Sequence, residues 1–527
     1  MRSYAAVAGA CVVVTMAAGC SGTRDQGGSA GAVVDGATFT LAVSADPGNL
    51  DPQGSVTSNV FEMSQFAYDH LLNADSAGKI SSGLATEWKV DGTKVTLTMR
   101  KGVTCSDGAP FTPADAAANV NYVADPKNKS PFLGVLLPYG AHATVDDQAG
   151  TVTVAAPDAP FVLTGLGNLP MVCAAGMKDR KTLARQTNGT GPYQLKLAEP
   201  GNQYTYTRRA GYSWGPGGAS TSTPGLPAEV VVKVIANETT AANLLLSGGL
   251  NAATVRGPDA QRLTAAHLYS SDQNNLLGEM WFNQSKGRVT AEQPIRLALT
   301  KALDLSQLAK VITSGRGGPA TTLAADPPVA CPGKSVPDAL PAHDLAAAGQ
   351  LLDQAGWTAG PDGIRAKNGK SLSVTFVHDT AGGPAGSAAA ELAVAGWKQL
   401  GVQVTVKPQD QTAIGSTLFS TGDWDISWEP VGVGSPDQLR PFLSGAVPPN
   451  GTNFASINNA DYQAGAAKAA TKPGSAGCSD WLAAETHLVS AADVIPFANQ
   501  TVKTFGNGAR FDQAMTLIPM SIRMVAR

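Results

Sequence analysis

The chain has 527 residues, of which 43% are hydrophobic and 15% are charged. This length exceeds what one hydrophobic core usually supports, so we expect two or more lobes, and the composition is typical of a folded rather than a disordered chain. The formal net charge of −3 gives no basic excess, which argues against a nucleic acid as partner.

The N-terminal segment has the pattern of an export signal. Arg2 precedes an apolar run at 5–18, which is too short to cross a bilayer core of ~30 Å. Small residues then lead to Cys20, as in a bacterial lipobox, where the cysteine is lipidated and becomes the mature N-terminus. This predicts a signal peptide at 1–19 and a flexible tether at 20–37. The alternative is an ordinary secretory signal cleaved nearby, and both interpretations predict export.

Strand and helix patterns alternate from residue 38 onward. Alternating apolar residues predict half-buried strands at 38–44, 94–100, 151–156, 193–197, 203–209, 373–378 and 402–406. A continuous apolar run at 229–236 predicts a central strand covered on both faces. Apolar residues at helical spacing predict helices at 112–125, 239–249, 293–312, 345–357 and 386–402. No internal repeat is present, so the predicted class is α/β with mixed sheets.

The body of the chain lacks a long linker rich in Pro and Ser. Two lobes would therefore be joined by strands that cross between them, and not by a flexible connector. The candidates are the extended segments 279–285 and 494–505, each of which connects stretches of different composition.

The segment 84–125 has the most specific pattern in the chain. It contains, in order, a tryptophan, an alternating strand, an arginine, a glycine, an Asp-Gly turn, a Pro-Phe-Thr run and an aspartate that opens a helix (Trp88, Arg100, Gly102, Asp107, Gly108, Pro110, Phe111, Thr112 and Asp115). Further matches follow in order at 188–195, 281–312, 346–357 and 422–430. Together they resemble family 5 of the solute-binding proteins of bacterial ABC transporters, the oligopeptide, dipeptide and nickel-binding group.

The resemblance implies a fold of two lobes. This is the type II periplasmic-binding-protein clamp, with a discontinuous first lobe, an inserted second lobe and hinge strands. On this pattern the first lobe covers 38–280, with a subdomain at about 60–187. The second lobe covers 281–497, and 498–527 return to the first lobe.

The resemblance also implies a function. The chain would be an extracytoplasmic, monomeric lipoprotein, held by Cys20 at the outer face of the cell membrane. It would capture a small solute, with peptide as the leading class, and deliver it to the permease subunits of an ABC importer. No enzymatic step, cofactor, metal or nucleic acid is implied.

Three alternatives stay open. The first is a receptor for a non-peptide solute or a blocked peptide, such as an opine or a sugar. The second is a secreted α/β hydrolase, although no serine lies in the strand-turn-helix context of a nucleophile elbow. The third is a lipoprotein that signals or acts as a chaperone instead of serving transport.

Four cysteines remain beyond the signal and the lipidation site: Cys105, Cys173, Cys331 and Cys478. In an exported protein they predict two disulfides, for which three pairings are possible. The wide spacing without a CxxC motif argues against a zinc site. The two-lobed fold favours the pairs 105–173 and 331–478, because each pair then stays within one lobe.

Six residues are candidates for ligand contact, by their position in the segments that resemble the cleft: Trp428, Glu429, Trp281, Asn283, Asn59 and Phe61. In peptide-binding members, an aspartate three residues after the tryptophan of this segment holds the α-ammonium of the ligand. Here that position is Val431. The loss of this carboxylate leaves the scaffold in place but questions whether the ligand is a peptide with a free amine.

Overall fold

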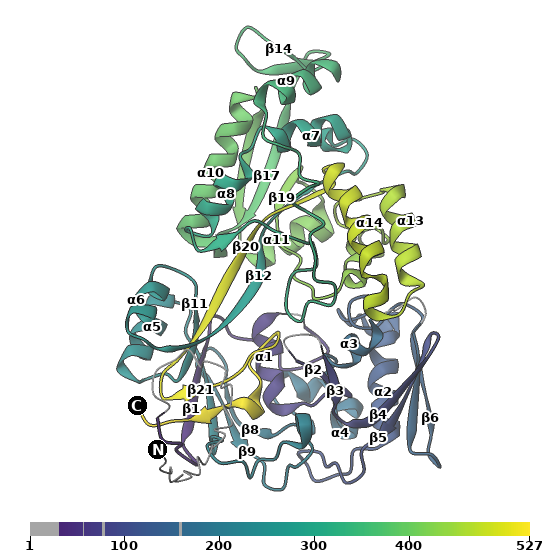
Figure 1. Ribbon diagram of the computed structural model, residues 1–527, viewed down its shortest axis with the longest axis vertical. Coiled ribbons are helices and arrows are strands. Elements are labelled where there is room, and N and C mark those ends of the chain that lie inside the picture. Colours follow the sequence, from purple (N-terminus) through teal and green to yellow (C-terminus); the bar gives the residue numbers. More distant parts are fainter. Residues whose placement is uncertain (1–30, 56, 76–78, 157–160) are drawn as a thin grey trace, which may run out of the picture.

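The structure is a computed structural model that describes residues 31–55, 57–75, 79–156 and 161–527. The predicted signal peptide and Cys20 lie outside the described residues. Figure 1 shows an elongated molecule in which a broad lower part and a narrower upper part are connected by two long strands, β12 and β20. We call the part that contains β1 and β11 the first lobe, and the part that contains β17 and β19 the second lobe.

One large mixed sheet runs through both lobes. Its strand order is β18-β17-β19-β12-β20-β11-β1-β10-β9-β8, with β13 beside β20. Its strands are β1 (Thr38–Val43), β8 (Tyr193–Glu199), β9 (Gln203–Arg208), β10 (Glu229–Val234), β11 (Ala252–Val255), β12 (Tyr269–Phe282), β13 (Gly317–Gly318), β17 (Ser373–Asp379), β18 (Gln403–Gln409), β19 (Ile426–Trp428) and β20 (Val494–Gly506). Parallel and antiparallel neighbours both occur, which confirms the predicted mixed α/β class.

The strands β12 and β20 form the connection between the lobes. They pair antiparallel from Tyr269 opposite Gly506 to Trp281 opposite Val494. The predicted crossing segment 494–505 coincides with β20, whereas β12 begins ten residues before the predicted segment 279–285. The first half of β12 is polar and partly exposed, so hydrophobic alternation did not mark it.

The remaining strands form four smaller sheets. A four-stranded sheet has the order β4 (Ala85–Asp91), β5 (Lys94–Met99), β7 (Thr151–Ala155) and β6 (His142–Asp146), and a three-stranded sheet has the order β14 (Thr358–Ala359), β15 (Arg365–Lys367) and β16 (Lys370–Ser371). Two further sheets have two strands each, β2 (Leu72–Ala74) with β3 (Ile80–Ser82) and β21 (Ala509–Arg510) with β22 (Arg523–Met524). The four-stranded sheet of the first lobe packs against α2 (Figure 1). The start of α2 is fixed by a capping box, in which Asp115 accepts from the Thr112 N–H at 2.7 Å.

The helices cover the sheets in both lobes. They are α1 (Ser58–Ala67), α2 (Pro113–Ala124), α3 (Val162–Leu166), α4 (Ala174–Lys178), α5 (Glu238–Ser247), α6 (Asp259–Ala265), α7 (Gln293–Lys301), α8 (Leu305–Ile312), α9 (Leu345–Gln354), α10 (Gly383–Gln399), α11 (Gln411–Ser416), α12 (Arg440–Leu443), α13 (Ala460–Ala470) and α14 (Cys478–Ser490). The single helix predicted at 293–312 is two helices, because Asp304 caps a new one by accepting from the N–H groups of Ser306 and Gln307. Among the described residues, no helix has the length and apolar character needed to cross a membrane.

Two disulfides each lie within one lobe. Cys105 is bonded to Cys173 in the first lobe and Cys331 to Cys478 in the second, with Cα atoms 6.2 Å and 5.2 Å apart. These are the two pairs that the two-lobed fold favoured. The sulfur atoms of all four of these cysteines are therefore in disulfide bonds.

Candidate functional site

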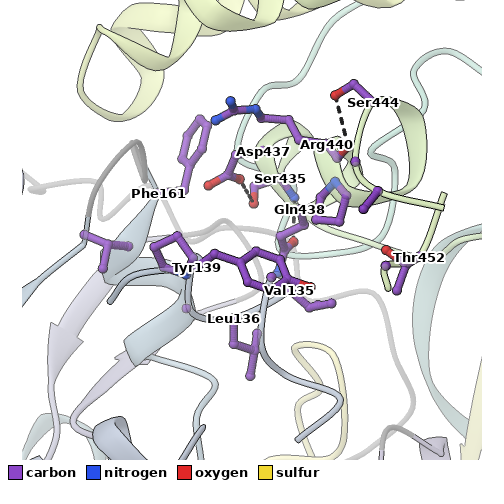
Figure 2. Close-up of a pocket in the computed structure, with 18 of the residues that line it drawn as sticks. Val135, Leu136, Tyr139, Phe161, Ser435, Asp437, Gln438, Arg440, Ser444 and Thr452 are labelled. Carbon is purple, nitrogen blue, oxygen red and sulfur yellow. Dashed lines mark hydrogen bonds between the residues drawn. The ribbon is translucent and has the colours of Figure 1, made fainter. Parts of the chain in front are cut away.

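A cavity of about 450 Å³ lies between the two lobes. Its first wall is the loop 134–139 together with Phe161 and the start of α3, all from the first lobe. Its second wall is η7 (Pro436–Leu439), α12 and the loop 444–452, from the second lobe. Figure 2 shows side chains from both walls facing a common space. The volume is in the range of ~300–1,000 Å³ that is usual for small-molecule sites.

The second wall is held by local hydrogen bonds. Ser435 and Gln438 form a capping box at the start of η7, in which the Gln438 Oε1 accepts from the Ser435 N–H at 3.1 Å. The Ser435 hydroxyl donates to Asp437 Oδ1 at 2.6 Å. Burial raises the pKa of the Asp437 carboxyl, and the hydrogen bonds from the Ser435 hydroxyl and from nearby backbone N–H groups, together with the positive charge of Arg440, oppose that rise. The wall therefore presents fixed polar groups to a solute.

The first wall presents aromatic and apolar surface. Phe161 is buried, whereas Tyr139 is 55% exposed and lies opposite the second wall (Figure 2). A half-exposed tyrosine at a cavity mouth offers a large apolar face and a hydroxyl to a ligand. The cavity thus combines apolar surface with a small number of polar groups, as sites for small organic solutes do.

The structure places four of the six predicted contacts at the hinge end of the second lobe. Trp428 is 5% exposed, and its ring packs against Phe376 and Phe497 at centroid distances of 5.0 Å and 5.1 Å. Asn283 is buried and donates to the carbonyl oxygen of Trp424 at 2.9 Å. Trp281 is fully buried and lies close to Glu429, as described below. None of these four lines the cavity between the lobes.

The other two predicted contacts lie in the first lobe. Asn59 donates to the carbonyl oxygen of Ala45 at 3.0 Å. Phe61 lines a second, smaller cavity of about 150 Å³, formed by α1, the segment around His70 and the C-terminal residues 514–520. The six candidates therefore do not lie in one site in the structure, and their contact with ligand stays a prediction.

A buried carboxyl group, Glu279 on β12, contacts the loop after β19 that leads to the second wall. Its Oε2 accepts from the Trp281 indole N–H at 3.2 Å and from the Val431 backbone N–H at 2.8 Å. The Trp281 indole also donates to the Glu429 carbonyl oxygen at 2.9 Å. Burial raises the pKa of Glu279 to about 8, against the two hydrogen bonds from Val431 and Trp281 and with a smaller contribution from the nearby carboxyl groups of Asp326 and Glu429. Val431 occupies the position where peptide-binding relatives would have an aspartate, and its backbone N–H donates to the carboxyl group of Glu279 instead.

Sequence reasoning did not identify Tyr139, Phe161, Arg440 or Glu279. Tyr139 and Phe161 lie 301 and 279 positions before Arg440, so their proximity to it depends on the fold. Arg440 directly follows η7, and the Pro436 at the start of that turn was a readable helix-start signal. Glu279 is a single acidic residue in an otherwise apolar stretch of β12, which was itself the available signal for a buried charge.

One protein family matches most of the chain. Residues 79–453 match the family described as bacterial extracellular solute-binding proteins, family 5 Middle. Protein XP55 of Streptomyces lividans is 30% identical over 394 residues, covering 72% of this chain and 67% of that protein. The periplasmic murein peptide-binding protein MppA of Escherichia coli K12 is 26% identical over 496 residues, covering 86% of each chain.

A solved structure matches over nearly the whole length. It is a substrate-binding protein from Microbacterium hydrocarbonoxydans complexed with 4-hydroxybenzoate hydrazide. It superposes with a TM-score of 0.76 at 25% sequence identity, covering 93% of this chain and 100% of that chain. The same fold therefore occurs in a substrate-binding protein that was solved with a small organic molecule bound.

Proposed function

This chain belongs to the bacterial extracellular solute-binding proteins of family 5, the substrate-binding components of ABC importers, and we propose that it captures a small peptide or a related solute in the cavity between its lobes. The fold is the type II periplasmic-binding-protein clamp. The observation that carries the proposal is that the walls of one cavity come from both lobes. A solute in contact with both walls stabilises the closed arrangement over an open one.

The ligand class rests on the chemistry of the cavity and on the relatives. MppA is named for a murein peptide, and the Microbacterium protein was solved with an aryl hydrazide. The cavity supplies apolar surface together with Asp437, Arg440 and Tyr139, which suits a small peptide. A second candidate ligand is a blocked peptide or a non-peptide solute such as an opine or a sugar. The presence of valine instead of an aspartate at position 431 favours it.

The membrane attachment and the partners are part of the same proposal. A lipid on Cys20 would hold the receptor at the outer face of the cell membrane, with the segment 20–37 as a tether. The filled clamp would dock as a monomer on the permease subunits. The family is one of binding proteins, so we propose capture and delivery of the solute without a chemical step.

Native mass spectrometry of the purified protein tests the proposal. The expected result is one solute per chain, released on unfolding and rebound after refolding. A chain that purifies empty and gains no thermal stability from fractionated growth medium would contradict the receptor function. Labelling by a fluorophosphonate would instead support the hydrolase alternative, because that probe reacts with an activated serine.

A further inference from the structure

The cavity beside Phe61, of about 150 Å³, lies within the first lobe. Its walls are α1, the segment 68–75 and the C-terminal segment 514–520. Among the described residues, none lines both this cavity and the cavity between the lobes. An apolar protein cavity of ~150 Å³ accepts a molecule of the size of benzene. The first lobe therefore has separate space for one small ring.

The C-terminal segment supplies much of the apolar lining of this cavity. The residues concerned are Met515, Ile518, Pro519 and Met520, and Phe61 of α1 adds an aromatic ring. Phe61 and Met520 are buried, and Met515 packs against the same core. Methionine side chains adapt to irregular shapes, and their sulfur atoms make favourable contacts with aromatic rings. This lining suits a flat, mostly apolar ligand.

The acidic groups at this cavity are already hydrogen-bonded. The Asp69 carboxyl accepts from the Tyr212 hydroxyl at 2.8 Å and from the Trp214 indole N–H at 3.0 Å. It also accepts from the Thr190 hydroxyl at 2.9 Å. Asp75 is exposed and accepts from a backbone N–H at 2.9 Å. In the described part of the chain, no lysine or arginine lines the cavity, so the lining favours a neutral ligand.

His70 lines the same cavity and has a nitrogen atom that the protein leaves unpaired. The residue is 8% exposed, and within the described ranges its Nε2 has no hydrogen-bond partner. Burial lowers the pKa of His70 to about 4, so the ring is neutral at pH 7. More than about 90% of buried polar groups have a partner. The free Nε2 therefore indicates a ligand that hydrogen-bonds to it.

A hydroxyl group is the partner that fits this ring in either tautomer. The Nε2 of a neutral imidazole donates in one tautomer and accepts in the other, and a hydroxyl both donates and accepts. An ammonium group only donates, and a carboxylate only accepts. A water molecule would also satisfy the nitrogen, but it would leave the apolar lining hydrated. A ring that carries a hydroxyl satisfies both parts of the cavity.

We propose that the first lobe holds a second ligand site, which takes a small neutral aromatic alcohol of the size of phenol. Its ring packs against Phe61, Met515 and Met520, and its hydroxyl forms a hydrogen bond with the Nε2 of His70. This ligand is distinct from the solute captured between the lobes. The inference therefore goes beyond the proposed function and does not depend on it.

Matched rings with and without a hydroxyl group test the site. The pairs are phenol with fluorobenzene, and 4-methylphenol with 4-fluorotoluene, while benzoate and benzylamine serve as charged rings. Their affinities for the full chain are measured by ligand-observed NMR titration at pH 7.5. We expect the hydroxyl to strengthen binding about tenfold, as a buried hydrogen bond does, and both charged rings to bind more weakly than phenol.

Four variants locate the bound ring. His70→Phe keeps a ring but removes the nitrogen, so the preference for phenol over fluorobenzene falls to about twofold or less. His142→Phe, at an exposed position of β6 in the same lobe, is the matched control and keeps the tenfold preference. Met515→Trp places a larger side chain in the cavity and weakens binding of both rings by about tenfold or more. Tyr139→Ala alters the cavity between the lobes and leaves phenol binding unchanged.

The site is overturned by any of four results. No neutral ring binds at about 10 mM, which is weaker than a small buried ring should bind. A charged ring binds more tightly than phenol. The preference for the hydroxyl is absent, or it persists in His70→Phe. Phenol binding is lost in Tyr139→Ala and kept in Met515→Trp, which would place the ring between the lobes. If His70→Phe is not folded by circular dichroism, the comparison of Met515→Trp with Tyr139→Ala decides.

Discussion

Glu279→Gln tests the buried carboxylate without any ligand. The structure places this side chain at zero exposure with its pKa raised from 4.5 to about 8. A carboxyl whose folded pKa lies above its unfolded pKa keeps a proton that the unfolded chain releases. Its contribution to stability is therefore fully present below pH 4.5 and is lost as the pH rises toward 8.

The size of the effect follows from the same linkage. Each pH unit in this window removes about 1.4 kcal/mol of stability that depends on Glu279. The free energy of unfolding of Glu279→Gln minus that of the wild type should therefore rise by about 3 kcal/mol between pH 5 and pH 7. Subtracting the wild type cancels the other titrating groups, which are common to both proteins.

Urea unfolding followed by tryptophan fluorescence measures this difference. Trp281 donates to Glu279, so its emission reports on the environment of the carboxylate. The measurement is made at pH 5, 6 and 7, with Glu87→Gln at an exposed position of β4 as the control that should give a flat difference. A flat difference for Glu279→Gln as well would refute the raised pKa of this buried carboxyl.

Three further results are expected. Tyr139→Ala should weaken solute binding by about tenfold in calorimetry with little change in melting temperature, because the ring is half exposed at the cavity; equal affinity would place the solute elsewhere. Trp428→Ala should cost about 3–5 kcal/mol of stability in urea unfolding, because a large buried ring is removed from the core, while affinity stays within about threefold; a larger loss of affinity would return Trp428 to the site. Replacing Cys331 and Cys478 by Ser should destabilise the second lobe by about 5 kcal/mol, since their bond closes a loop across 147 positions; an unchanged unfolding midpoint would contradict that estimate.

The elements of the fold were readable because their signals are local. The Thr112-Pro113 start of α2 and the alternation in β5 and β7 are properties of short windows, and the structure reproduces them. The break between α7 and α8 was missed, although Asp304 is a good N-cap, because the apolar spacing continues across it. The polar first half of β12 was missed because its side chains show no apolar alternation. Its strand conformation is stabilised by backbone pairing with β20.

The site was less readable because it depends on distant contacts. Tyr139 and Arg440 face one cavity only through the packing of two lobes. The sequence showed that position 431 has a valine in place of an aspartate, but residue spacing did not show which side chain would approach this position. The fold brings Glu279 to its backbone N–H from 152 positions earlier in the chain. The absence of an aspartate at residue 431 therefore does not leave the region without a carboxyl group.

Hydrogen exchange measured by mass spectrometry tests the central claim most directly. The solute released from the purified protein is added back, and the exchange of the empty and filled chains is compared. Capture between the lobes predicts that protection on binding is concentrated in 134–139 and 435–452, the two walls of the cavity. Protection confined to one lobe, or found only outside these two segments, would contradict it.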